Sequence, residues 1–177
     1  MEDQTTDLAA KVDAACRLTG QFTLRSGLTV AEYFDKYRFE TRPELLRQIA
    51  EAIVPLLPTD TEALAGLELG GVPIATMVSS LTGLPALFVR KEPKAYGTKQ
   101  LVEGGDVRGV RVTLIEDVIT TGGAVRNAAM SLRELGAQVH TVVCAIDRAE
   151  PGINILESIG VTTRSVLTKS MLDQARA

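Results

Sequence analysis

The stretch Arg111-Val112-Thr113-Leu114-Ile115-Glu116-Asp117-Val118-Ile119-Thr120-Thr121-Gly122-Gly123-Ala124-Val125 decides the fold of this 177-residue chain. It begins as an apolar run with β-branched residues, which is typical of a strand buried on both faces of a parallel sheet. Two adjacent carboxylates, Glu116 and Asp117, come near its end, and a Thr-Thr-Gly-Gly turn then leads into helix-forming sequence. The stretch therefore predicts a strand, a tight loop and the start of a helix.

The loop in this stretch has the features of an anion-binding site. The first N–H groups of a helix have no partner within the helix, and the helix dipole adds partial positive charge there. Thr120 and Thr121 offer hydroxyl donors, while Gly122 and Gly123 let the backbone approach a ligand closely. The loop is neither a Walker A nor a G-x-G-x-x-G sequence. The carboxylates of Glu116 and Asp117 come shortly before the loop, where the ribose hydroxyls would lie if the bound anion were a 5′-phosphate.

The simpler alternative is an ordinary strand-to-helix connection with a polar N-cap. Against it, two ionised carboxylates at the end of a buried strand lose solvation that only a bound group restores. We therefore favour the binding site.

Strands and helices alternate along most of the chain. Short apolar runs predict strands at residues 63–67, 86–89, 111–119, 139–146 and 163–167. The segments between them predict helices at residues 72–81, 123–135 and 153–159. This alternation predicts an α/β fold with a parallel twisted sheet of about five strands, flanked by helices and joined by right-handed crossovers.

The N-terminal region departs from the alternation. Residues 5–18 predict a helix that Gly20 ends, and an antiparallel hairpin is expected around residues 22–34. A capping box at Thr41, with Pro43 early in the helix, predicts a helix that runs to about Leu57.

The length of the chain suits one domain. We expect a single domain over residues 1–177, in which a small N-terminal hood of about residues 1–40 covers one edge of the sheet. A helical C-terminal tail, residues 168–177, is expected to pack on this hood.

Polar residues follow the ends of several predicted strands, and parallel strands place their carboxyl ends at the same edge of a sheet. Gly70 and Gly71 follow one strand, Arg148 follows another, and a long basic loop at residues 90–106 follows a third. A loop of this length inside a compact domain is usually functional or disordered. We expect these segments to meet the acidic pair at one edge of the sheet.

Composition excludes several classes of function. The net charge is −3 and there is no Trp, so a nucleic-acid-binding face is not expected. The N-terminus is acidic and polar and no apolar run approaches membrane length, so no membrane association is expected. Cys16 and Cys144 lie in apolar segments and indicate buried thiols of a cytoplasmic protein. His140, the only histidine, is expected to be structural.

The segment from Arg111 to Val125 resembles the signature of type I phosphoribosyltransferases. The resemblance implies that the substrate is 5-phosphoribosyl 1-diphosphate (PRPP) and that Glu116 and Asp117 hold its ribose hydroxyls. It also implies a set of residues that hold the 5′-phosphate: Val118, Ile119, Thr120, Thr121, Gly122, Gly123 and Ala124. The implied cofactor is Mg²⁺, with no direct protein ligands because PRPP oxygens and water would bind most of it.

The loop that begins Val89-Arg90-Lys91-Glu92-Pro93-Lys94-Ala95-Tyr96-Gly97-Thr98 resembles the mobile catalytic loop of orotate phosphoribosyltransferases. The resemblance implies that Arg90, Lys91 and Lys94 stabilise the diphosphate leaving group, with Tyr96 and Gly97 in the lid. It further implies a homodimer in which this loop is shared across the interface. An isolated basic loop is more often a solvated surface, so this role rests on the resemblance.

The acceptor is implied by other segments that are similar to the same family. Arg148 would pair with the carboxylate of orotate, since a guanidinium fork suits a planar carboxylate. Phe34 and Arg25, in the hood, and Thr120 complete the implied orotate site. Gly70 stands where better-known members have Lys, and Tyr96 where they often have His. The implied reaction forms orotidine 5′-monophosphate and diphosphate in pyrimidine biosynthesis.

Two alternatives remain at the level of sequence. A phosphoribosyltransferase for another nucleobase would share the central signature but not the loop around Arg90 or the role of Arg148. A regulator that senses PRPP without catalysis would bind PRPP without turnover.

Overall fold

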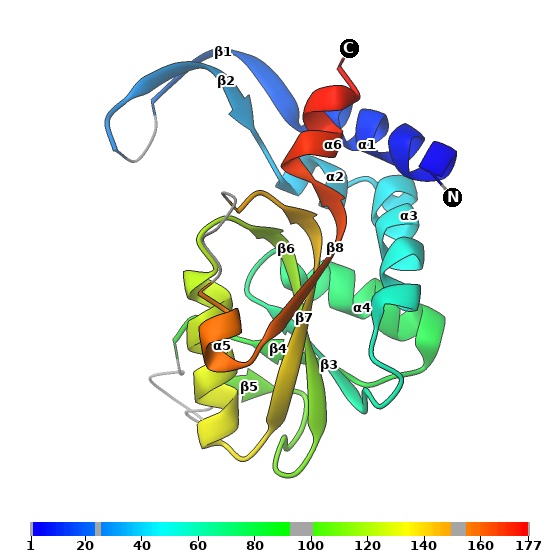
Figure 1. Cartoon of the computed structure of the whole chain (residues 1–177), viewed down its shortest axis with the longest axis vertical. Helices are drawn as coiled ribbons and strands as arrows, with labels where there is room; N and C mark the ends of the chain where they lie inside the picture. The colour runs from blue at the N-terminus through cyan, green and yellow to red at the C-terminus, as the bar shows by residue number, and fades with distance from the viewer. Residues whose placement is uncertain (1, 24–25, 93–100, 150–154, 177) are drawn as a thin grey trace.

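A six-stranded sheet forms the centre of the protein (Figure 1). The computed structural model describes residues 2–23, 26–92, 101–149 and 155–176. The strand order is β5-β4-β3-β6-β7-β8. The bounds are Ala63–Leu67 for β3, Ala86–Val89 for β4, Val102–Glu103 for β5, Arg111–Ile119 for β6, Gln138–Asp147 for β7 and Thr162–Thr168 for β8. The chain therefore folds as the α/β protein that the alternating pattern predicts.

Five of the strands run parallel, and β5 is the exception. Val102 and Glu103 pair antiparallel with Val89 and Phe88 of β4. This sixth strand was not predicted, because its residues fall in the long loop expected at residues 90–106. A strand of two residues has no detectable period, so only its pairing with β4 defines it.

The apolar run in β6 is continuous because its residues feed two separate cores. Leu114 packs in the core beneath α5 (Gly123–Glu134), whereas the next residue, Ile115, packs in the core beneath α3 (Pro43–Ile53) and α4 (Gly71–Thr82). Successive strand residues point to opposite faces, so a strand covered on both sides must be apolar throughout. This arrangement confirms the prediction of a doubly buried strand.

Glycines bring α4 onto the sheet. A Cβ added to Gly66 of β3 would lie 2.6 Å from the carbonyl oxygen of Gly71, and one added to Gly71 would collide with the carbonyl oxygen of Ile115 in β6. Side chains at either position would separate the helix from the strands. The close contact fixes the β3–α4 loop at the carboxyl edge of the sheet, next to the end of β6.

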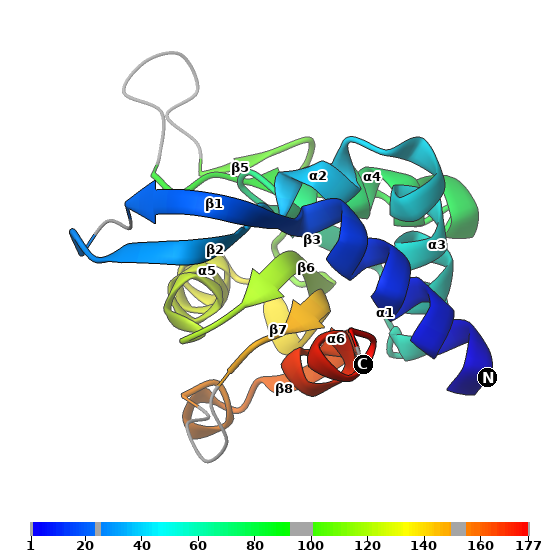
Figure 2. The same cartoon turned by 90° about the horizontal axis from the view of Figure 1, so that it is seen from above.

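The N-terminal segment contains α1 (Glu2–Cys16), the hairpin strands β1 (Arg17–Thr23) and β2 (Thr29–Phe34), and the short helix α2 (Tyr37–Glu40). The hairpin extends away from the sheet, beyond the carboxyl ends of the parallel strands (Figures 1 and 2). Its prediction is confirmed. The prediction that Gly20 ends the first helix is wrong, because the helix ends at Cys16 and Gly20 lies inside β1, where the strand register is irregular.

The helix predicted at residues 41–57 is divided into α3 and a turn of 3₁₀ helix at Val54–Leu56. Pro43 begins α3 as predicted, but Arg42 is the N-cap and makes no side-chain capping bond. The predicted capping role of Thr41 is therefore wrong. The Thr41 hydroxyl instead bonds the carbonyl of Arg38, in the preceding helix α2.

The C-terminal helix α6 (Lys169–Gln174) packs beside α1 (Figure 1). Thr168 caps it by accepting a hydrogen bond from the backbone N–H of Met171 at 3.2 Å. Arg17 lies 3.4 Å from Asp173, and Arg176 lies 2.8 Å from Glu32 of β2. The chain's last described helix is thus joined to both α1 and the hairpin.

A 3₁₀ turn at Glu157–Ile159 precedes β8.

Candidate functional site

The strand β6 delivers its carboxylates and its turn to the carboxyl edge of the sheet. Glu116 and Asp117 are buried within the strand, with 8% and 0% of their surface exposed, whereas Thr120 and Thr121 are exposed. Gly122 then adopts a φ of 75° as the N-cap of α5, a left-handed conformation that favours glycine. The backbone turns sharply there, so the N-terminus of α5 opens beside the two threonines.

This turn has the geometry of an anion cradle. The helix α5 is 12 residues long. At its N-terminal end the Arg126 N–H donates a hydrogen bond to the carbonyl of the N-cap residue Gly122 at 2.9 Å. The N–H groups that precede it lie at the positive end of the helix dipole. Thr120, Thr121 and Ala124 are all exposed around it. The structure therefore brings the predicted phosphate residues together on one accessible turn.

The carboxylate of Asp117 is held at both oxygens. Its Oδ1 accepts a hydrogen bond from the backbone N–H of Val118 at 2.6 Å, and its Oδ2 lies 2.7 Å from Nζ of Lys36. Lys36 directly precedes α2, and its side chain is 34% exposed. A residue of the hood thus supplies the counter-ion for a buried carboxylate at the centre of the sheet.

A third carboxylate, from Glu40 at the end of α2, joins this cluster. Glu40 is 8% exposed, and a Cβ added to Gly70 would lie 2.8 Å from its Oε1 and closer still to the carboxylate of Asp117. Among the described residues, Oε1 of Glu40 and Oε2 of Glu116 have no hydrogen-bond partner, and Oδ2 of Asp117 has only the ion pair with Lys36. Glu40, Glu116 and Asp117 are called the acidic cluster below.

Burial sets the protonation of the acidic cluster. It raises the pKa of Glu116 to about 9 and that of Glu40 to about 8, and the neighbouring Asp117 carboxylate adds to both. Burial also acts to raise the pKa of Asp117, but contacts with Glu116, Lys36 and the Val118 N–H outweigh it and lower that pKa. These shifts favour a single negative charge in the cluster at neutral pH, on Asp117, opposite the positive charge of Lys36.

Lys36 and Glu40 were not predicted as site residues. Their one local signal is that Lys36 and Glu40 are charged residues four positions apart, in a segment that also contains the aromatic residues Tyr37 and Phe39. This spacing places them on the same face of a helix. It does not show that the face meets Asp117, because that contact joins segments far apart in the sequence.

Arg148 lies where the hood meets the sheet. Its backbone N–H donates to the carbonyl of Ile119 at 2.8 Å, and its guanidinium carbon lies 5.0 Å from the centre of the Phe34 ring. This distance is typical of a cation–π contact. The structure thus brings together two of the predicted orotate residues, Arg148 and Phe34. The backbone of Arg148 also bonds Ile119, the residue before the third one, Thr120.

The long loop after β4 is closed at its base. The Arg90 N–H donates to the carbonyl of Leu101 at 2.9 Å, and the Arg90 guanidinium lies 3.8 Å from Glu103. The Lys91 N–H donates to the carboxylate of Glu68 at 2.9 Å, which links the loop to the β3–α4 turn. The predicted site residues Lys94, Tyr96 and Gly97 in this loop, and Arg25 in the hairpin, lie outside the described residues.

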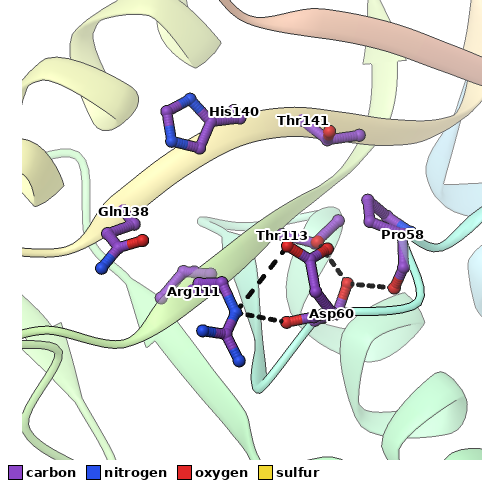
Figure 3. A pocket seen from close by; sticks show the side chains of 9 residues that line it. Pro58, Asp60, Arg111, Thr113, Gln138, His140 and Thr141 are labelled. Carbon is purple, nitrogen blue, oxygen red and sulfur yellow. Dashed lines mark hydrogen bonds and ion pairs between the residues drawn. The ribbon is translucent and has the colours of Figure 1, made fainter.

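A small pocket lies at the opposite end of the strands (Figure 3). It is lined by the first residues of β6 and β7, including Arg111 and the exposed His140. The guanidinium of Arg111 is engaged by the Asp60 carbonyl at 2.9 Å and by the Glu62 carboxylate at 2.9 Å. His140 therefore lies at the other end of its strand from Arg148.

Within the described part of the chain, no group of three His, Cys, Asp or Glu residues is arranged to hold a metal ion. None of the helices found there combines the length and apolar character needed to cross a bilayer. Cys16 and Cys144 are buried free thiols, and burial raises the pKa of both.

Comparison with known proteins places this geometry in a family. Residues 38–163 match the model of the phosphoribosyl transferase domain. The chain is similar to an orotate phosphoribosyltransferase of Nocardioides sp., with 65% identity over 96% of this chain and 94% of the relative.

Two solved structures of Mycobacterium tuberculosis H37Rv orotate phosphoribosyltransferase have the same architecture. The complex with Fe(III) dicitrate superposes with a TM-score of 0.85 and 32% identity, and covers 96% of this chain and 98% of that one. The complex with PRPP superposes with a TM-score of 0.78 and 30% identity over 96% and 99% of the two chains. The resemblance found in the sequence is confirmed.

Proposed function

The chain belongs to the orotate phosphoribosyltransferase family, and we propose that it transfers the 5-phosphoribosyl group of PRPP to orotate. The products are orotidine 5′-monophosphate and diphosphate, a step of pyrimidine biosynthesis. One observation of the structure supports this most directly: the acidic pair of β6 leads into an exposed Thr-Thr-Gly-Gly turn at the N-terminus of α5. A sugar phosphate requires this combination of ribose acceptors and phosphate donors.

The reaction breaks the bond between C1′ of the ribose and the diphosphate oxygen, and the electron pair leaves with the diphosphate. N1 of orotate then bonds to C1′, and its proton is taken up by the departing diphosphate. Positive charge develops on the ribose, and the ionised Asp117 beside it is placed to offset that charge. Glu116, which is protonated at neutral pH, can donate or accept a hydrogen bond from a ribose hydroxyl.

The 5′-phosphate would bind at the turn from Val118 to Ala124. Backbone N–H groups at the start of α5 and the hydroxyls of Thr120 and Thr121 are its donors. Because these groups belong to a strand end and a helix start, they hold the phosphate rigidly relative to Asp117. A fixed donor geometry of this kind lowers the entropic cost of reaching the transition state.

The donor set also suits Mg²⁺, which prefers oxygen ligands and rarely has an all-protein cage. Oε2 of Glu116 has no hydrogen-bond partner among the described residues, but burial raises the pKa of this carboxyl, so we do not propose it as a direct ligand. We propose that diphosphate and ribose oxygens hold most of the ion. When bound, it neutralises negative charge on the diphosphate.

Departure of the diphosphate requires cations, and the loop after β4 supplies them. Arg90 and Lys91 lie at the base of this loop, beside the β3–α4 turn. With Lys94 they would stabilise the charge that develops on the leaving oxygen. Closure of the loop, with Tyr96 and Gly97 in the lid, would exclude water that could hydrolyse the activated sugar.

Orotate would bind between the hood and the sheet. The Arg148 guanidinium can form two parallel hydrogen bonds with the orotate carboxylate, while Phe34 holds the guanidinium through its ring face. Thr120 and Arg25 complete the proposed site. Adenine and uracil lack the carboxylate, so they would leave Arg148 without its partner.

The first experiment mixes the protein with PRPP, Mg²⁺ and orotate and follows the loss of the orotate ultraviolet band. We expect turnover that depends on PRPP. Added uracil or adenine should inhibit this turnover only weakly. No PRPP-dependent change with orotate, but turnover with another base, would assign the chain to that base. Binding of PRPP without turnover of any base would favour a regulator.

We also propose a homodimer in the cytoplasm, with the loop shared between subunits. If Lys94 acts in the partner's site, mixing Lys94→Ala protomers with Asp117→Asn protomers creates one intact site per mixed dimer. Activity should then return after the two inactive variants are mixed. A mixture that stays inactive, despite mixed dimers being detected by mass spectrometry, would refute the shared loop.

A further inference from the structure

The contact between Lys36 and Asp117 crosses from the hood to the centre of the sheet. Asp117 has no exposed surface, and its Oδ2 lies 2.7 Å from the Lys36 Nζ. No other cation is within ion-pair distance of Asp117 among the described residues. The charge of this carboxylate is therefore balanced by a residue that belongs to a different layer of the protein.

Crowding makes that balance necessary. Glu40 from α2 and Glu116 from β6 both face Asp117, and a buried carboxylate next to two others is costly to ionise. Cys144 of β7 lies opposite Glu116 in the strand register, and burial raises its pKa, so it remains a neutral thiol. The β3–α4 turn approaches with Gly70, which has no side chain to offer a charge. Lys36 is thus the cation that decides which of the three carboxylates is ionised.

We propose that Lys36 is a positioning residue of the ribose site, which keeps Asp117 ionised and in one orientation so that the ribose hydroxyls of PRPP meet a ready acceptor. The inference rests on the proposed function, because it needs PRPP as the substrate. Each oxygen of an ionised carboxylate has lone pairs for two hydrogen bonds. Oδ1 and Oδ2 can therefore keep Val118 and Lys36 and still accept from a hydroxyl once PRPP displaces the groups that cover Asp117.

The structure also explains why the cation comes from the hood. A Cβ at Gly70 would collide with the Asp117 carboxylate and lie 2.8 Å from Oε1 of Glu40, so the β3–α4 turn has no room for a side chain there. The Lys36 side chain reaches Asp117 from the N-terminal end of α2 instead, with its ammonium 5.3 Å from the centre of the Tyr37 ring. Placement of the hood on the sheet and ionisation of the ribose site thus depend on the same ion pair.

The test compares Lys36→Met with the wild type, measuring kcat and KM for PRPP at several pH values between about 6 and 8. Loss of an opposite charge raises the pKa of a carboxyl by about 1 to 3. Asp117 then protonates more readily as pH falls. We expect KM for PRPP in the variant to exceed that of the wild type by a few-fold at the lowest pH, where part of Asp117 is protonated, and the ratio of the two to shrink as pH rises. Taking this ratio cancels the titration of the PRPP phosphates themselves.

Two further variants separate positioning from general stability. Lys36→Arg keeps the charge and should restore a low KM for PRPP at least in part. Lys11→Met removes a lysine from an exposed pair with Asp7 on α1 and should leave both constants unchanged. Thermal melting of each variant shows how much folded protein is present.

The outcomes are distinct. A Lys36→Met enzyme with wild-type KM for PRPP at every pH, or with a loss confined to kcat and melting temperature, would overturn the proposal. Tighter PRPP binding in that variant would also overturn it, because Lys36 would then compete with the ribose. Absence of turnover in the wild-type enzyme would instead refute the proposed function, and direct titration of PRPP binding would still test Lys36.

Discussion

Replacement of Gly70 by alanine tests the acidic cluster with a single methyl group. Gly70 has a φ of −67°, which any residue adopts, so the backbone itself accepts alanine without strain. The added Cβ, however, would lie 2.8 Å from Oε1 of Glu40 and closer to the Asp117 carboxylate, within the 3.0 Å that real Cβ contacts do not enter. The effect of Gly70→Ala therefore comes from displacement of these carboxylates.

The size of the effect follows from that displacement. Asp117 has to move by about 1 Å or more, and a misplacement of this size in a catalytic site can lower the rate about 100-fold. That loss equals about 2.7 kcal/mol of transition-state stabilisation. Overpacking also costs roughly 1–3 kcal/mol of folding stability, which the lower entropy of the unfolded alanine chain offsets by about 0.4–1 kcal/mol.

The matched control is Gly83→Ala at the other end of the same helix. Gly83 is the C-cap of α4 with a φ of 76°, and its Cβ would meet nothing within 4 Å. Left-handed backbone costs alanine about 1 kcal/mol, so this variant loses stability without touching the acidic cluster.

Both variants are assayed for kcat/KM with PRPP from the orotate ultraviolet band, and for stability by urea unfolding. We expect a loss of about 100-fold for Gly70→Ala alone. Equal kcat/KM in the two variants would show that the position of Asp117 does not matter for PRPP.

Three other changes address the leaving group, the acceptor and the buried charge. Lys94→Ala should lower kcat by roughly 10²–10⁴-fold if Lys94 stabilises the diphosphate as an oxyanion-hole donor does, and a near-normal kcat in steady-state kinetics would exclude that role. Arg148→Ala should raise KM for orotate and leave PRPP affinity little changed, whereas an equal loss of both in the same kinetics would make Arg148 structural. Glu116 keeps a proton in the folded state up to its pKa of about 9, while the unfolded chain releases it near pH 4.5, so the free energy of unfolding falls as pH rises between these values. In Glu116→Gln this fall, measured by urea unfolding between about pH 5.5 and 8.5, should be less steep by up to about 1.4 kcal/mol per pH unit, and an unchanged slope would mean that Glu116 is already ionised.

Much of the sheet is predictable because its signals are local. The β-branched run of β6 and the glycine turn at Gly122 are each a few residues long, and each has one favoured backbone conformation. Alternation of strands and helices then restricts the topology, because parallel strands require right-handed crossovers. Errors occur where the local signal is weak or competes with another. Gly20 resembles a helix stop, but pairing with β2 places it in a strand.

The candidate site divides in the same way. The sequence by itself determined the anion turn and the acidic pair, and it placed Arg148 at the same edge, because the carboxyl ends of parallel strands converge. Only the tertiary structure decided that Lys36 and Glu40 lie against Asp117, and that Phe34 lies against Arg148. The physical reason is that α2 is four residues long and has no strong preference of its own. Its position, and with it the charge of the site, is set by the packing of the hood on the sheet.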